Sequence, residues 1–120
     1  MSNKIVNYRD LEVWQRAIEL TDFVYGITSK FPPEERYGLS AQMRKAAVSI
    51  ASNIAEGTRH RTPGFISRVI ISLGEHAELE TQAIIAGRRH YISSADMLHF
   101  EKLATSAGQL AHGLLRSLER

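Results

Sequence analysis

Few side chains in this sequence have the type and spacing that chemistry requires. Asp96 and His99 form its one acid-x-x-His pair, the spacing with which helical bundles hold metal ions. Such sites need further inward-facing glutamates and a second pair, which the sequence does not offer. Asp96 is also well placed to serve as the N3 residue of a helix capped by Ser93. We therefore expect no metal site.

Nucleophilic chemistry lacks a motif as well. Ser49, Ser52 and Ser67 have no nucleophile elbow around them and no neighbouring histidine in the sequence. The chain has no cysteine, which excludes thiolate catalysis, cysteine-ligated zinc and iron–sulfur clusters, and permits a reducing compartment. We interpret the chain as a non-enzyme without a cofactor.

Length and charge set further bounds. The 120 residues fit one domain, 1–120, with a hydrophobic core of its own. Fifteen basic and 13 acidic residues give a net charge of +2, a mild field that does not by itself indicate nucleic-acid binding. The sequence has no secretory leader pattern and no run near the ~20 apolar residues of a membrane span. We expect a cytoplasmic protein that does not enter a membrane.

The chain is divided by three clusters of helix-breaking residues, at 31–33, 57–64 and 87–94. They predict four helices at about 8–30, 37–56, 63–87 and 94–119. Short connections between long helices favour antiparallel neighbours. The predicted fold is therefore an all-α, up-down-up-down four-helix bundle.

Apolar residues at alternating spacings of four and three predict which face of each helix is buried. The first helix has such a seam at Val13, Ala17, Leu20, Val24, Ile27 and Phe31, and the third at Ile66, Ile70, Leu73, Ala77, Glu80, Ile84 and Gly87. Glu80 thus falls on an apolar seam. After the second helix, Gly57 suits a left-handed C′ position.

Several segments together resemble a known family. They are Tyr8-Arg9-Asp10-Leu11-Glu12-Val13-Trp14, Phe31-Pro32, the run from Tyr37 through Ser49-Ile50-Ala51-Ser52-Asn53-Ile54-Ala55-Glu56-Gly57, then Leu73-Gly74, Glu78-Leu79-Glu80-Thr81-Gln82 and Tyr91-Ile92. In this order they resemble the bacterial four-helix-bundle proteins encoded by intervening sequences within large-subunit (23S) ribosomal RNA genes. The resemblance covers nearly the whole chain.

The resemblance implies a cytoplasmic bacterial protein that forms a ring-shaped homo-oligomer, expected to be a pentamer, without known enzymatic activity. A related bundle is the accessory protein of diversity-generating retroelements, a basic pentamer that binds nucleic acid and a reverse transcriptase. This chain is less basic, and Glu75, Glu78 and Glu80 add acid to its third helix.

Buried polar side chains form a first set of candidates. A buried carboxylate is costly unless it is paired. We expect a structural polar network, with a ligand site as the alternative, made of Asn53, Glu56, Glu80 and Arg44. A hairpin of the second and third helices about residue 60 would place Arg44 opposite residue 76, near Glu75 or Glu78.

Basic side chains form a second set, because the up-down topology gathers them at the end that holds both termini. The candidates for contact with RNA or DNA phosphates are Arg9, Arg59, His60, Arg61, Arg68 and Arg116. Lys4 would join them. A ring would repeat this cluster around one rim.

A second stripe beside the seam of the first helix makes a third set. Leu11, Trp14, Ile18 and Tyr25 fit either the bundle core or a subunit interface. The leading interpretation is a non-catalytic homo-oligomer that acts as a scaffold for RNA or protein. The alternative is a nucleic-acid-binding accessory factor that uses a basic rim.

Overall fold

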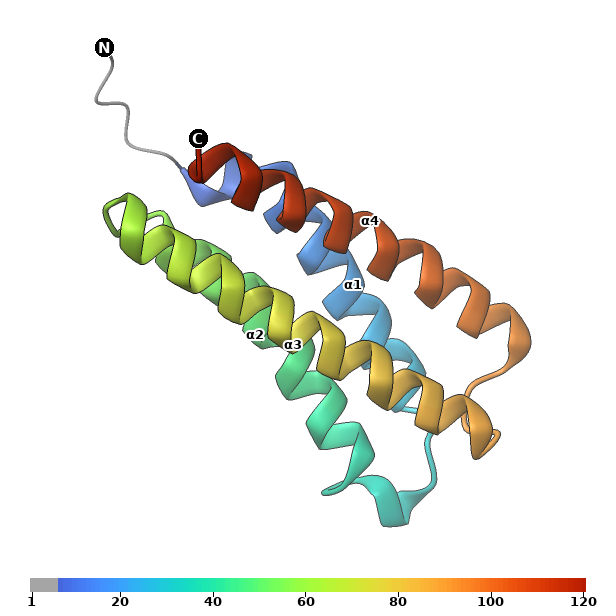
Figure 1. Cartoon of the computed structure of the whole chain (residues 1–120). Helices are drawn as coiled ribbons and strands as arrows, with labels where there is room; N and C mark the ends of the chain where they lie inside the picture. The colour runs from blue at the N-terminus through green and yellow to red at the C-terminus, as the bar shows by residue number, and fades with distance from the viewer. Residues whose placement is uncertain (1–6) are drawn as a thin grey trace.

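The computed structural model describes residues 7–120, and this part of the chain contains helices but no strand. It has four long helices and two short 3₁₀ turns, one at Tyr8–Asp10 before the first helix and one at Pro33–Glu35 between the first and second (Figure 1). The helices are α1 (Glu12–Thr28), α2 (Leu39–Gly57), α3 (Thr62–Arg88) and α4 (Ser94–Leu118).

The helix ends follow from local residue chemistry. The first predicted helix begins as the 3₁₀ turn, because Leu11 is extended (φ −74°, ψ 125°) and α1 starts only after it. Ser93 caps α4 as predicted, its Oγ accepting from the Asp96 N–H at 3.1 Å. At the end of α3, His90 adopts φ 63°, and Tyr91 N–H donates to the Ala86 carbonyl at 2.9 Å. This is a Schellman ending with histidine where glycine is usual.

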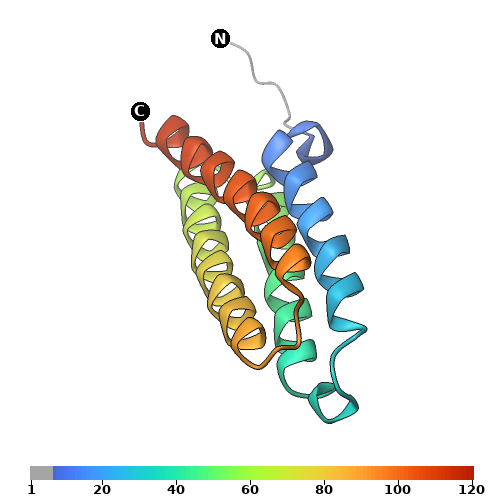
Figure 2. The same cartoon turned by 90° about the vertical axis from the view of Figure 1, so that its right-hand side faces the viewer.

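Successive helices run in opposite directions, as Figures 1 and 2 show. The Thr21 hydroxyl of α1 reaches the Ala47 carbonyl of α2, and the Ser72 hydroxyl of α3 reaches the Ile50 carbonyl. The antiparallel order shows in two other contacts: Thr28 at the end of α1 accepts from Arg44 near the start of α2, and Asn53 near the end of α2 accepts from Arg68 near the start of α3. In the described part the backbones of α1 and α3 each approach those of α2 and α4, whereas the Cα atoms of the diagonal pairs stay more than 8 Å apart. The predicted all-α antiparallel four-helix bundle is confirmed.

The core lies along the bundle axis in two clusters that share Trp14 at their border. The predicted seam of α1 is confirmed, since all six of its residues are buried. Facing it are Met43, Ile50 and Ile54 of α2 and Phe100 of α4, all buried. Small residues of α2 and α4 let the backbones approach closely: Ala46, Ala47, Ala51, Ala104, Ala107 and Ala111 are all buried.

The predicted seam of α3 is wrong by one residue. The buried positions are Phe65, Val69, Ser72, Leu79, Ala83 and Ala86. Ile70, Ala77 and Ile84 of the predicted seam are exposed, and Glu80 is half-exposed. Because α3 has apolar residues on more than one face, its periodicity does not fix its rotation; packing against α2 and α4 does.

Gly57 has a different role from the predicted one. No glycine in the described residues has positive φ, and Gly57 is the last residue of α2. A Cβ built on it would lie 2.6 Å from Cδ1 of Phe65 and 3.3 Å from Cβ of Arg68. Glycine is needed here because α3 passes close to the backbone of α2.

Candidate assembly surface and basic end

The pair of residues with metal-site spacing is engaged elsewhere. Asp96 Oδ2 lies 3.5 Å from Lys30 Nζ, and the His99 ring stacks on Phe23 with centroids 4.4 Å apart. Among the described residues no three histidine or carboxylate side chains come together as a metal site would require. None of the helices in this part of the chain combines the length and apolar character of a membrane span.

Asn53 is the centre of a polar cluster between α2 and α3. Its buried amide donates to the Ser49 carbonyl and hydroxyl oxygens, at 2.9 and 3.0 Å. Its oxygen accepts from Arg68 Nη1 at 3.2 Å, and Arg68 Nη2 lies 3.3 Å from Glu56 Oε1. Arg68, which the sequence assigned to nucleic-acid contact, therefore connects Asn53 to Glu56. This arrangement fixes the register of the two helices.

Arg44 lies outside that cluster. Its Nε donates to Thr28 Oγ1 at 2.8 Å, and its guanidinium carbon lies 4.6 Å from the centroid of the Tyr25 ring. The predicted pairing of Arg44 with Glu75 or Glu78 is corrected, because Arg44 extends from α2 toward α1 rather than toward α3.

Glu80 belongs to a third group, between α3 and α4. Nε2 of His76 lies 2.6 Å from the Ala104 carbonyl and must donate to it, since a carbonyl only accepts. Nδ1 of the same ring lies 3.5 Å from Glu80 Oε1. A single buried network of Asn53, Glu56, Glu80 and Arg44 is therefore not what forms. Of these four residues, the structure brings together only Asn53 and Glu56, through Arg68.

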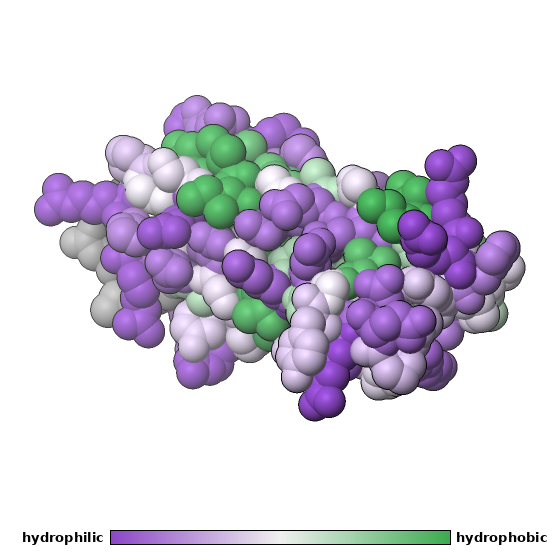
Figure 3. Space-filling model, turned by 90° about the horizontal axis from the view of Figure 1, so that it is seen from below, coloured by the Kyte–Doolittle hydropathy of each residue, from purple (hydrophilic) through white to green (hydrophobic). Residues whose placement is uncertain are grey.

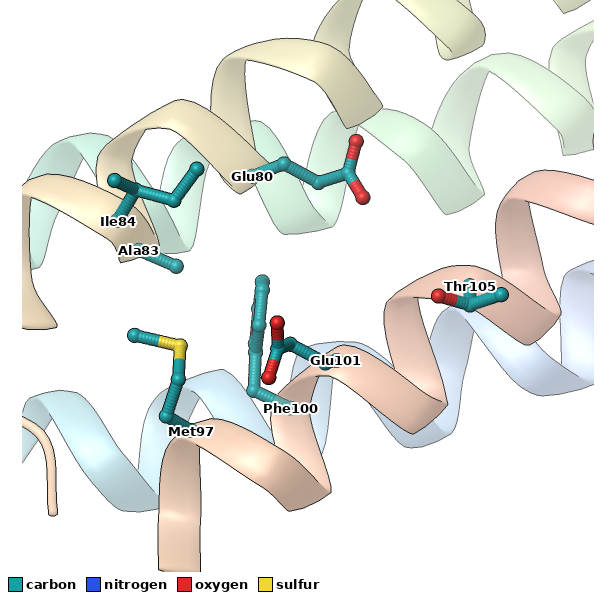
Figure 4. A pocket seen from close by; sticks show the side chains of 7 residues that line it. All are labelled: Glu80, Ala83, Ile84, Met97, Phe100, Glu101 and Thr105. Carbon is teal, nitrogen blue, oxygen red and sulfur yellow. The ribbon is translucent and has the colours of Figure 1, made fainter. Parts of the chain in front are cut away.

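A cavity of about 120 Å³ lies beside Glu80. Figure 4 shows the Glu80 side chain of α3 and those of Met97, Phe100 and Glu101 of α4 around the same space. Its floor is apolar and its two carboxylates have the same charge. The described residues place no Lys or Arg in an ion pair with either carboxylate.

A further polar contact ties the two loops at the far end of the bundle. Tyr91 Oη donates to Glu35 Oε2 at 3.1 Å. Burial, the hydrogen bond to Glu35 and the negative charge of Glu35 raise the pKa of Tyr91. Glu35 Oε1 accepts from the Leu39 N–H at 3.1 Å, so one carboxylate holds the start of α2 and the end of α3.

The predicted basic end is assembled by the topology. The start of the described chain, the α2–α3 loop and the C-terminus lie at the same end of the bundle (Figure 1). There the following predicted residues are exposed and have no carboxylate within ion-pair distance among the described residues: Arg9, Arg59, His60, Arg61 and Arg116. Lys4 lies outside the described residues. An anion could approach this end without displacing an internal ion pair.

The apolar stripe of α1 that was a candidate interface is mostly part of the bundle. Leu11, Trp14 and Ile18 are half-buried against the core clusters. Trp14 also packs edge-on against Tyr8, with centroids 5.3 Å apart. Tyr25 alone is exposed, under the guanidinium of Arg44.

The main unpartnered apolar surface lies on α3 instead. Ile70, Ile71, Ile84 and Ile85 point away from the core and are between 43% and 59% exposed. Apolar areas interrupt the polar surface on the underside of the bundle (Figure 3). Sequence reasoning missed this surface because it assigned Ile70 and Ile84 to the core. The signal was present, since α3 has more large apolar residues than one seam can bury.

The comparisons with known proteins identify the family. The family model of the 23S rRNA-intervening sequence protein matches residues 9–113. The chain belongs to this family. No curated protein matches the sequence.

Among solved structures, this family member resembles a protein of unknown function from the S23 ribosomal protein family of Bacteroides thetaiotaomicron. The two share 21% sequence identity with a TM-score of 0.80, over 87% of this chain and 95% of that chain. This likeness supports the bundle fold.

Proposed function

We propose that this family member is a non-catalytic cytoplasmic subunit that assembles with copies of itself into a closed ring, a scaffold for RNA or protein. The resemblance to the family leads us to expect five copies. The observation that carries the proposal is the outward face of α3 with its four exposed isoleucines.

The energetic argument rests on how these isoleucines are arranged. Single exposed apolar residues are ordinary on a protein surface. Four large ones on the outward side of one helix, in two pairs separated by Gly74, Ala77 and Thr81, form two apolar patches on that helix, and exposed apolar patches mark interaction sites. Each square ångström of apolar surface removed from water contributes about 25 cal/mol. In the single chain the four isoleucines stay in contact with water, so this stabilisation is gained only when another surface covers them.

The test is the solution mass, measured by light scattering after size exclusion, for the unmodified protein and two variants. Ile84→Lys places a charge on the proposed surface. Leu98→Lys is the matched control, because Leu98 of α4 is 57% exposed and Ile84 59%. We expect about five times the 13.5 kDa of one chain for the unmodified protein and Leu98→Lys, and a smaller species for Ile84→Lys. A 13.5 kDa unmodified protein would refute the assembly.

The second candidate function is nucleic-acid binding through the basic end, favoured by its exposed cations, which form no ion pair with a carboxylate of residues 7–120. Affinity for a single-stranded RNA should fall steeply with salt, with a slope of about −0.7 per phosphate contacted. Arg59→Ala with Arg61→Ala should reduce both the affinity and the slope. Arg36→Ala, an exposed arginine at the other end of the bundle, is the control. RNA binding that is absent at low salt would exclude this candidate.

A further inference from the structure

The outward face of α2 is narrow, because its residues are short. Positions at spacings of four and three along this face are Ala41, Lys45, Val48, Ser52 and Ala55. The first four are exposed and Ala55 is half-buried. Val48 is the only large apolar side chain among them, and Lys45 the only charge. The face is therefore a shallow strip with one apolar projection.

The outward face of α3 has the opposite relief. Its bulky residues lie at two levels, Ile70 with Ile71 and Ile84 with Ile85, and between them are Gly74, Ala77 and Thr81. A Cβ built on Gly74 would meet nothing within 4 Å. A mid-helix glycine costs about 0.8–1.0 kcal/mol relative to alanine, and no contact inside the chain explains it here. Glycine at such a place allows another chain to approach closely.

Contacts between α2 and α3 show which residues of the two helices lie at the same height. Ser72 Oγ donates to the Ile50 carbonyl at 2.6 Å, and Arg68 reaches Asn53 at 3.2 Å. The residue numbers in these pairs add up to 122 and 121. By the same rule Val48 lies at the height of Gly74.

Residue numbers that add up to about 122 also pair the other outward residues of α2 and α3. Lys45 lies at the height of Ala77 and its neighbour Glu78, and Ser52 at the height of Ile70. In a ring whose axis is parallel to the bundles, each copy keeps the same height, so these pairs would face each other between copies.

We infer that the outward face of α2 in one copy packs against the outward face of α3 in the next copy, with Val48 seated over Gly74. This inference rests on the proposed self-assembly and assigns the two surfaces that meet. The projecting side chain of one face meets the gap in the other, and the isoleucines flank it. Lys45 and Glu78, which border one groove between α2 and α3 within a copy, give the two faces opposite charges at the same height, so the occupant with matching shape and charge is a second copy.

The positions of the two faces on the bundle favour a ring close to the expected five copies. In a square bundle the outward directions of adjacent helices differ by about 90°. When two faces about 90° apart on the same copy form the contact, each copy is rotated by roughly 90° relative to the one before it. The ring therefore closes after roughly four or five copies. Opposite faces would instead give an open filament.

Cysteine cross-linking tests the contact cleanly, because the described chain has no cysteine of its own. Val48→Cys and Gly74→Cys are made singly, mixed in denaturant, refolded together and treated with a short bis-maleimide. We expect the mixture to give a covalent dimer, and each variant alone to give none.

Gly74→Leu provides a second measurement, with Gly26→Leu as its control. A Cβ built on Gly26 of α1 also meets nothing within 4 Å, so both substitutions suit the single chain. Only Gly74→Leu should lower the solution mass.

Three results would overturn the inference, and they differ in whether the proposed self-assembly is also refuted. An oligomer whose mixed variants do not cross-link has its contact elsewhere, and the proposed function stands. Self-linking of Gly74→Cys alone would mean that two α3 helices face each other. An unmodified protein that is monomeric would remove both the inference and the proposed function.

Discussion

Gly57→Ala should destabilise the bundle although alanine is the better helix former. The added Cβ would lie 2.6 and 3.0 Å from two ring carbons of Phe65, and 3.3 Å from Cβ of Arg68. Phe65 is buried, and Arg68 is held by Asn53 and Glu56. The methyl group can therefore enter only if α2 and α3 move apart or the ring leaves its position.

The two opposing effects differ in size. Alanine gains at most about 1 kcal/mol over glycine inside a helix, and less at a final residue. Forcing an extra carbon into a packed site costs about 1–3 kcal/mol. We expect a net loss of roughly 1–2 kcal/mol for Gly57→Ala. Gly26→Ala, with open space around its Cβ, should instead gain about 0.5–1 kcal/mol.

Urea and thermal unfolding followed by circular dichroism would measure the difference, at one fixed protein concentration because assembly shifts apparent stability. The two variants should differ by about 1.5–3 kcal/mol. Adding Phe65→Leu to Gly57→Ala should recover part of the loss, a coupling that a double-mutant cycle reports. Equal stability of the two alanine variants would refute the close-approach explanation of Gly57.

Three further predictions follow from the core and the loops. Ile50→Asp should abolish cooperative melting, because an unpaired buried charge costs several kcal/mol out of a total of ~5–15; Leu98→Asp is the exposed control, and a normal melt for Ile50→Asp would contradict the core assignment. His90→Gly should raise the free energy of unfolding by about 0.5–1 kcal/mol, and the urea midpoint with it, since φ 63° strains a residue with a Cβ. An unchanged or lower midpoint would count against that strain. The raised pKa of Tyr91 means that the folded state keeps the phenol proton longer than the unfolded state. Tyr91 therefore adds to the free energy of unfolding below about pH 10, the ordinary pKa of tyrosine. This stabilisation is lost as the pH rises through the pKa of Tyr91 in the folded state. Tyr91→Phe should lose stability less steeply there, and identical pH profiles would show that the Glu35 contact has no such effect.

The candidate sites differ in whether chain topology alone places their residues or whether the packing of side chains decides their partners. Up-down topology alone brings Arg9, Arg59 and Arg116 to one end, so the sequence could place them without knowing how each helix is rotated. It could not divide its buried polar residues among partners. Arg44 contacts α1, Asn53 contacts Arg68 of α3, and Glu80 pairs with His76 of its own helix. The choice of partner depends on how each helix is rotated about its axis.

The sequence by itself determined the four helices, their antiparallel order and the buried face of α1. Proline, glycine and capping residues act locally, and a single apolar seam leaves a helix one way to face the core. Only the tertiary structure decided the rotation of α3, whose isoleucines offer more than one seam. Ser72 reaches the Ile50 carbonyl, and Ala83 and Ala86 are buried against the neighbouring helices. These packing contacts turn Ile70 and Ile84 outward, because small and hydrogen-bonding side chains permit a closer approach than isoleucine does.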